Sequence, residues 1–181
     1  LEEFLKQKEK LSDISIQKDE QIIKNLSDNI TKLGGKPNLN NKNQKELIKE
    51  LNKEYERLSV VKVLNDKSKN IIVDKKIKNI NIRMQKIIDL PPKELRKLVD
   101  LGKKEIGEGI VTIFASKDGK IGLAVGVTNN LIKKYDAVKF VKAGSEIIGG
   151  KGGGGRTDFA QAGGIFEDKI EEAFKKFETL I

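Results

Sequence analysis

Apolar residues in the first third of the chain recur at helical spacing. Four of them lie three or four residues apart and therefore share one helical face: Ile23, Leu26, Ile30 and Leu33. A second stripe of the same kind follows: Leu47, Leu51, Tyr55, Leu58, Val61 and Leu64. The segment 34–41, Gly-Gly-Lys-Pro-Asn-Leu-Asn-Asn, separates the stripes and breaks a helix. The pattern predicts an antiparallel hairpin of two helices within residues 1–65.

The helical pattern is weaker at the start of the chain. Leu1, Leu5, Ile14 and Ile16 do not continue the first stripe, and the β-branched segment 12–16 predicts a bend. A hairpin of this kind has little core of its own. We therefore expect it to pack either on the second domain or on a second copy of itself.

Beyond residue 66 the apolar period changes to that of strands alternating with helices. Strands are predicted at 70–74, 77–83, 110–115 and 121–127, and helices at 91–106, 135–148 and 166–180. The Asp-Gly pair at 118–119 predicts a hairpin turn. The fold class is therefore α+β or α/β: a helical hairpin, then a small domain over residues 66–181. That domain is expected to have a mixed sheet and a glycine-rich loop before the last helix.

Composition restricts the function. The 181 residues contain 36 Lys and Arg against 27 Asp and Glu, a net charge of +9 that favours a polyanionic partner such as nucleic acid. A lysine-rich soluble surface explains the same charge equally well. The chain has no histidine and no cysteine, which excludes His-dependent triads, thiolate or imidazole metal sites and disulfides. No apolar run approaches the roughly 20 residues of a membrane span.

The chemically distinctive segment is the glycine tract, residues 149–164, in which every second residue on average is glycine. Positive-φ glycines can direct successive N–H groups to one side and form an anion-binding nest with a cation beside it. The candidate nucleic-acid-binding residues are accordingly Lys151, Gly152, Gly153, Gly154, Gly155, Arg156 and Gln161. Phe159 and Ala160 are expected to anchor the tract inward. The alternative is a structural loop with an internal Arg156–Asp158 ion pair.

Known phosphate-binding motifs do not fit this chain. A nucleoside-triphosphate loop would need glycine at position 145 and a hydroxyl residue at 152, where the chain has serine and glycine. A dinucleotide-binding fingerprint beginning at Gly107 would need a third glycine at Thr112. No catalytic residues and no metal ligands are therefore predicted.

The tract also carries a resemblance. Residues 152–164, GGGGRTDFAQAGG, closely resemble the glycine-rich signature near the end of alanyl-tRNA synthetases, and residues 95–102 and 123–127 also look like that family. The resemblance covers residues 66–181. Residues 1–65 are similar only in kind, as a helical segment that joins an editing domain to a terminal domain.

The resemblance implies a non-catalytic C-terminal domain with a helical subdomain, residues 1–65, and a globular subdomain, residues 66–181, of the kind associated with DHH phosphoesterases. It implies binding of tRNA(Ala) at the outer corner, homodimerisation through the helical subdomain, and coupling of aminoacylation with editing in upstream domains. No cofactor is expected here, since ATP and zinc belong to the upstream parts. The implied location is the cytoplasm, with no membrane partner.

Two alternatives stay open. The first is a nucleic-acid-binding accessory domain of a DHH-type phosphoesterase or nuclease. Those relatives carry histidine in the glycine loop where this chain has Arg156, which counts against it. The second is a purely structural dimerisation piece.

Overall fold

The computed structural model describes all 181 residues and divides into two compact units, Leu1–Lys62 and Val63–Ile181. The boundary lies three residues before the predicted one, within the last turn of a helix that runs to Asn65. None of the helices combines the length and the apolar character that a membrane span requires.

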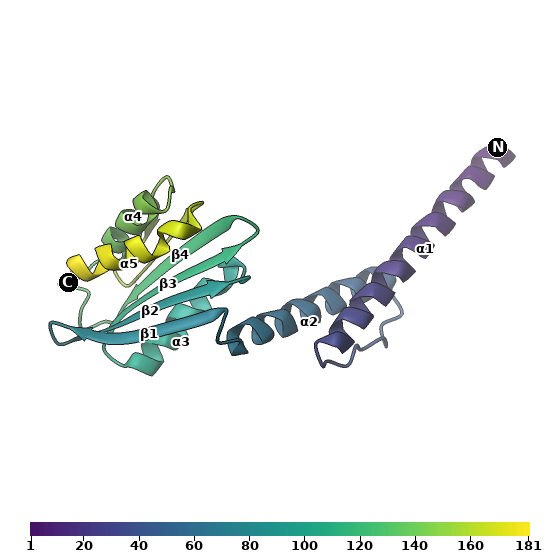
Figure 1. Ribbon diagram of the computed structural model, residues 1–181. Coiled ribbons are helices and arrows are strands. Elements are labelled where there is room, and N and C mark those ends of the chain that lie inside the picture. The colour runs from purple at the N-terminus through teal and green to yellow at the C-terminus, as the bar shows by residue number, and fades with distance from the viewer. The chain divides into compact units, whose positions relative to one another are not determined.

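The first unit is the predicted helical hairpin. It consists of α1 (Glu2–Lys32) and α2 (Gln44–Asn65), drawn in purple to blue in Figure 1. Asn43 begins α2, because its side-chain oxygen accepts hydrogen bonds from the amides of residues 45 and 46. The two helices bury a small cluster from the expected stripes: Ile30, Leu47 and Leu51, flanked by Ile23, Leu26, Tyr55 and Leu58.

The predicted bend at residues 12–16 is wrong, because α1 continues through this segment without interruption. The segment contains neither proline nor glycine. An isoleucine lowers helix propensity by less than about 0.7 kcal/mol relative to alanine, which is too little to break a 31-residue helix. This first half of α1 extends beyond the cluster and leaves several large apolar side chains exposed: Leu1, Phe4, Leu5, Leu11, Ile14 and Ile16.

The second unit is built on a mixed sheet, as predicted, but the sheet has six strands where the sequence predicted four. The strands are β1 (Asn70–Ile77), β2 (Ile80–Ile88), β3 (Gly109–Lys117), β4 (Lys120–Val127), β5 (Gly153–Gly155) and β6 (Phe159–Gly164). Their order in the sheet is β1-β2-β3-β4-β6-β5, and only the β2–β3 pair is parallel. β1 and β5 are therefore the two edges.

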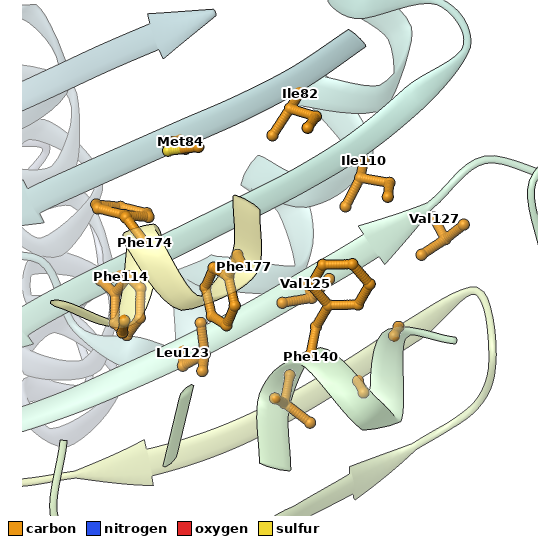
Figure 2. Packing of buried hydrophobic residues seen from close by; sticks show 14 of the residues in the cluster. Ile82, Met84, Ile110, Phe114, Leu123, Val125, Val127, Phe140, Phe174 and Phe177 are labelled. Carbon is orange, nitrogen blue, oxygen red and sulfur yellow. The ribbon is translucent and has the colours of Figure 1, made fainter. Parts of the chain in front are cut away.

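Helices cover both faces of this sheet. α4 (Ala137–Ile147) and α5 (Ile170–Thr179) lie on one face, and α3 (Leu95–Ile106) lies on the other (Figure 1). The core beneath α4 and α5 is aromatic, as Figure 2 shows: the Phe114 ring meets Phe174 edge-on at 5.0 Å and Phe177 in a stacked arrangement at 5.9 Å. Aromatic pairs at these separations add about 0.5–1.5 kcal/mol beyond their buried area.

An ion-pair clamp holds the α3 face. The Arg83 side chain of β2 is 9% exposed and donates to both carboxylate oxygens of Asp74 on β1, at 2.8 Å each. It also pairs with Glu105 on α3. The hydrogen bonds from Arg83 hold the pKa of Asp74 below its ordinary value, although partial burial opposes the shift. The clamp therefore joins the edge strand, its neighbour and the helix through one guanidinium group.

The junction of the first two strands differs from the sequence prediction, because β1 runs to Ile77 rather than ending at residue 74. The second strand was expected to begin at Ile77, but Lys78 and Asn79 form a two-residue turn with φ of 48° and 70°, and β2 begins at Ile80. Positive φ at both turn residues suits the twist of a tight hairpin. The alternation of apolar and polar residues breaks at this turn, where the two polar residues Lys78 and Asn79 are consecutive.

Candidate nucleic-acid interface

The glycine tract is more regular than the expected loop, because it contains both β5 and β6. The two strands form an antiparallel hairpin at one edge of the sheet, with β6 against β4. Arg156 and Phe159 exchange backbone hydrogen bonds of 2.8 and 3.3 Å across the turn Thr157-Asp158. Glycine has a low strand propensity, so the pairing of β6 with β4, and not the propensity of the residues, makes this segment a hairpin.

The base of the hairpin is attached to α4 through Ser145, which is completely buried. Its hydroxyl donates to the carbonyl oxygen of Gly163 at 3.0 Å and accepts from the amide of Gly152 at 3.3 Å. Gly150 allows this close approach, since a Cβ there would lie 1.9 Å from the same Gly163 oxygen. Gly152 has a φ of 102°, a conformation that side-chain-bearing residues rarely adopt.

The turn of the hairpin is held as firmly as its base. The amides of Val127 and Ala137 donate to the carbonyl oxygens of Asp158 and Thr157 at 2.9 and 3.0 Å. The Lys103 ammonium of α3 donates to the Asp158 carbonyl oxygen at 2.9 Å. Three separate elements therefore fix the turn, which makes it a preorganised surface.

Phe159 is the side chain that joins the hairpin to α3. It is 9% exposed, and the Arg96 guanidinium of α3 lies 4.9 Å above its ring centre. Arg156 is the cross-strand neighbour of Phe159 and so projects from the same face of the sheet. Two exposed guanidinium groups therefore flank one buried aromatic ring.

The face beside these arginines is open. Gln161 alternates with Phe159 along β6 and lies on the same face, opposite Gly154. A Cβ built on Gly154 would meet nothing within 4 Å. The hairpin thus presents a strip of bare backbone beside an exposed amide side chain, and an approaching backbone or phosphate would encounter no steric barrier there.

This hairpin leaves fewer free backbone N–H groups than the predicted anion nest requires. The amides of Gly152 and Arg156 already donate within the protein. Because Arg156 and Phe159 form a hydrogen-bonded pair, the alternation of an antiparallel ladder directs the amides of Gly153 and Gly155 outward from the open edge of β5. The backbone donors that remain available are therefore these two edge amides.

The structure brings together most of the predicted site residues. Gly153, Gly154, Gly155, Arg156 and Gln161 lie on one short hairpin, while Lys151 is exposed just before β5. The predicted inward packing of Phe159 and Ala160 is confirmed, and so is the Arg156–Asp158 ion pair, with Nε and Oδ1 3.2 Å apart.

Sequence reasoning missed Arg96 and Lys103. No spacing rule links α3 to a tract more than forty residues later, so only the structure shows that these cations adjoin it. No group of three or more acidic side chains in the chain is arranged to hold a metal ion.

Comparisons with known proteins agree with this part of the fold. Residues 84–181 match the DHHA1 domain family. The chain is 48% identical over 103 residues to an alanine–tRNA ligase of Parvibaculum lavamentivorans, an alignment that covers 56% of this chain and 12% of that protein. The chain therefore matches about an eighth of the length of this relative.

Among solved structures, the C-Ala domain from Aquifex aeolicus alanyl-tRNA synthetase matches with a TM-score of 0.56 and 29% identity. The match covers 60% of this chain and 96% of that domain. RecJ from Thermus thermophilus matches with a TM-score of 0.44 and 14% identity, over 76% of this chain and 20% of that protein, which is too low to carry an argument.

Proposed function

Because the chain belongs to the DHHA1 domain family and is related to the C-terminal domain of alanyl-tRNA synthetases, we propose that it acts as the tRNA-binding C-terminal part of an alanine–tRNA ligase. Its ligand is tRNA(Ala), bound at the outer corner of the folded molecule. It performs no chemistry itself and serves the aminoacylation and editing domains of the same enzyme.

The observation that supports tRNA binding is the fixed glycine hairpin with its flanking arginines. Arg96 and Arg156 provide planar guanidinium groups that suit phosphate oxygens, and the outward amides of Gly153 and Gly155 provide neutral donors. The bare strip at Gly154 allows an RNA backbone to lie directly against the protein backbone. Every one of these groups reads phosphate or shape, and none reads a base edge.

The composition supports the same mode of binding. Most of the aromatic side chains of the second unit are buried in its core, so they are not available to stack on bases. Base edges in an RNA duplex lie in a narrow major groove that side chains cannot enter. We therefore expect recognition of a folded RNA surface, with little discrimination among tRNAs by this chain alone.

A binding series with three RNAs tests this function: folded tRNA, a single strand of equal length and a simple duplex. We expect folded tRNA to bind most tightly and each affinity to fall steeply with salt. A preference for the single strand would favour an accessory domain of a nuclease instead. Absence of binding to all three at low salt would leave a structural role.

Homodimerisation through the hairpin is the second part of the proposal. The first half of α1 extends beyond the hairpin's own cluster, and its apolar side chains are exposed, Phe4 at 68% and Leu11 at 67%. Pairing with a second copy would bury them. Sedimentation of the chain should show a dimer that Leu11→Asp abolishes, whereas Leu101→Asp on α3, also half-exposed, should not. A wild-type monomer at high concentration would contradict this part.

Coupling between aminoacylation and editing is the consequence expected in the parent enzyme. If this chain holds the tRNA while its acceptor end moves between sites, substitution of Arg96 and Arg156 in the parent should raise the fraction of mischarged tRNA released. The rate of alanine activation, which does not involve tRNA, should stay unchanged. An unchanged mischarged fraction would contradict the coupling.

A further inference from the structure

The edge of the sheet opposite the glycine hairpin is apolar and unpaired. β1 carries three consecutive aliphatic side chains, Ile71, Ile72 and Val73, which are 44–49% exposed. Ile71 and Val73 also line a groove of about 280 Å³ whose floor includes Met84 and Phe174. Natural sheets usually protect such an edge with charge, proline or a bulge. Over these three residues β1 has none of these.

The backbone of β1 is open on its outer side. The amide of Ile88 donates to the carbonyl oxygen of Lys69 at 2.9 Å, which fixes the phase of the β1–β2 ladder. Hydrogen bonding alternates along an antiparallel strand, so residues 71, 73 and 75 bond to β2. The N–H and C=O groups of residues 70, 72 and 74 therefore point away from the sheet.

We propose that β1 is a self-pairing edge, on which a second copy of the chain aligns its own β1 antiparallel about a two-fold axis through Ile72. The two sheets then form one continuous sheet of twelve strands. The inference does not depend on RNA binding, because β1 and the glycine hairpin lie at opposite edges.

The sequence of β1 is complementary to itself in this register. Ile72 lies opposite Ile72 of the second copy, and Ile71 lies opposite Val73, so aliphatic side chains meet on both faces. Asn70 lies opposite Asp74, so this position pairs two polar residues, each of which already has hydrogen-bond partners within its own chain. Moving the axis by one residue in either direction would place Ile72 against Asn70 or Asp74. The register about Ile72 is therefore the one that matches apolar with apolar residues.

The like charges that meet at the ends of the strand are compensated within each copy. In this register Lys75 faces Lys69 of the second copy, but each lysine already has its own carboxylate. Lys69 pairs with Asp89 at 2.6 Å, and Lys75 pairs with Glu178 on α5. Each lysine that meets a lysine across the axis would thus bring its own carboxylate, which reduces the repulsion between the two cations.

The size of the surface determines the expected affinity. A single eight-residue strand provides less than the about 800 Å² per partner of a standard interface, so the pairing is expected to be weak and concentration-dependent. Trapping by a disulfide is the appropriate measurement. The chain has no cysteine, so each introduced thiol is the only one present.

The test is a cysteine scan of β1 in the full chain. Residues in a hydrogen-bonded antiparallel pair have Cα atoms about 5.5 Å apart, within the range that a disulfide spans. Ile72→Cys should therefore form a covalent dimer at least about tenfold faster than Lys76→Cys, because the two copies of residue 76 would lie roughly 26 Å apart. Equal rates at both positions, or a maximum at Asp74→Cys, would overturn the proposal.

Two further variants show whether the cross-link reflects pairing through β1, and not a change in folding or dimerisation through the helical hairpin. Ile71→Lys with Val73→Lys should suppress the Ile72→Cys cross-link by at least about tenfold and leave the melting temperature unchanged, because both side chains are half-exposed. Leu11→Asp should remove hairpin dimerisation and leave the cross-link intact. A cross-link that survives the two lysines, or disappears with Leu11→Asp, would overturn pairing through β1.

Discussion

Phe159 is the side chain on which the candidate site depends, and Phe159→Ala is the substitution that tests its packing. Removal of the ring leaves a cavity between β6 and α3 and removes the surface on which the Arg96 guanidinium lies. The backbone bonds that hold the turn are not altered directly. The variant therefore separates side-chain packing from the hydrogen bonds to Asp158 and Thr157.

The magnitude follows from burial. Truncation of a buried phenylalanine typically costs 3–5 kcal/mol, and the 9% exposure of Phe159 at the end of the sheet favours the lower half of that range. The cation–π contact with Arg96 accounts for about 0.5–1 kcal/mol of it. We expect a loss of about 3–4 kcal/mol in the free energy of unfolding, or roughly 10–15 °C in melting temperature.

The two tyrosines allow each unit to be followed separately. Tyr55 belongs to the hairpin and Tyr135 to the core of the second unit. In a Tyr55→Phe background, fluorescence of Tyr135 during urea unfolding reports only the second unit. Phe166→Ala, which truncates a ring that is 47% exposed, is the matched control and should cost about 1 kcal/mol. A cost below about 1 kcal/mol for Phe159→Ala would refute the packing argument.

Three smaller predictions concern the same unit. Gly150→Ala should lower the free energy of unfolding by more than about 2 kcal/mol, because the new Cβ would overlap a main-chain oxygen. Gly154→Ala, whose Cβ would meet no atom, should change it by less than about 0.5 kcal/mol. Equal effects of the two variants in urea unfolding would contradict this. The hydrogen bonds from Arg83 lower the folded-state pKa of Asp74, so the ion pair stabilises the fold above the unfolded pKa of about 3.9 and this stabilisation is lost as pH falls through the folded pKa. Asp74→Asn should therefore reduce the loss of unfolding free energy at acid pH. An unchanged loss would be inconsistent with the clamp. Asp158→Asn removes the carboxylate that pairs with Arg156, and should therefore strengthen tRNA binding by up to about fivefold at low salt. Weaker binding would argue against a phosphate contact at Arg156.

Much of the architecture was predictable because local signals agreed with the final contacts. The stripes of the hairpin, the Asp118–Gly119 turn and the proline at the start of the α3 region each indicate one local structure, and the fold retains them. The inward anchor Phe159 was predictable as well, since it is the one aromatic residue within the polar and glycine-rich segment.

The remaining features depend on partners that are distant in sequence. The strands within the glycine tract form because β4 offers an edge, and no glycine propensity would indicate them. Arg96 joins the site only because α3 packs on β3 and β4, beside β6, and Ser145 anchors the glycine tract from α4. The open edge at β1 is likewise a property of the assembled sheet, because a sequence pattern does not specify which strand lies outermost.

The central claim is that tRNA contacts the glycine hairpin through the arginines that flank Phe159. The most direct measurement is the slope of log affinity for folded tRNA against log salt for Arg96→Gln with Arg156→Gln. The control is Lys175→Gln with Lys176→Gln, which removes the same charge from α5 on the opposite face of the sheet. The account predicts a slope shallower by about 1–2 for the arginine variant and an unchanged slope for the control. Equal slopes in the two variants would contradict it.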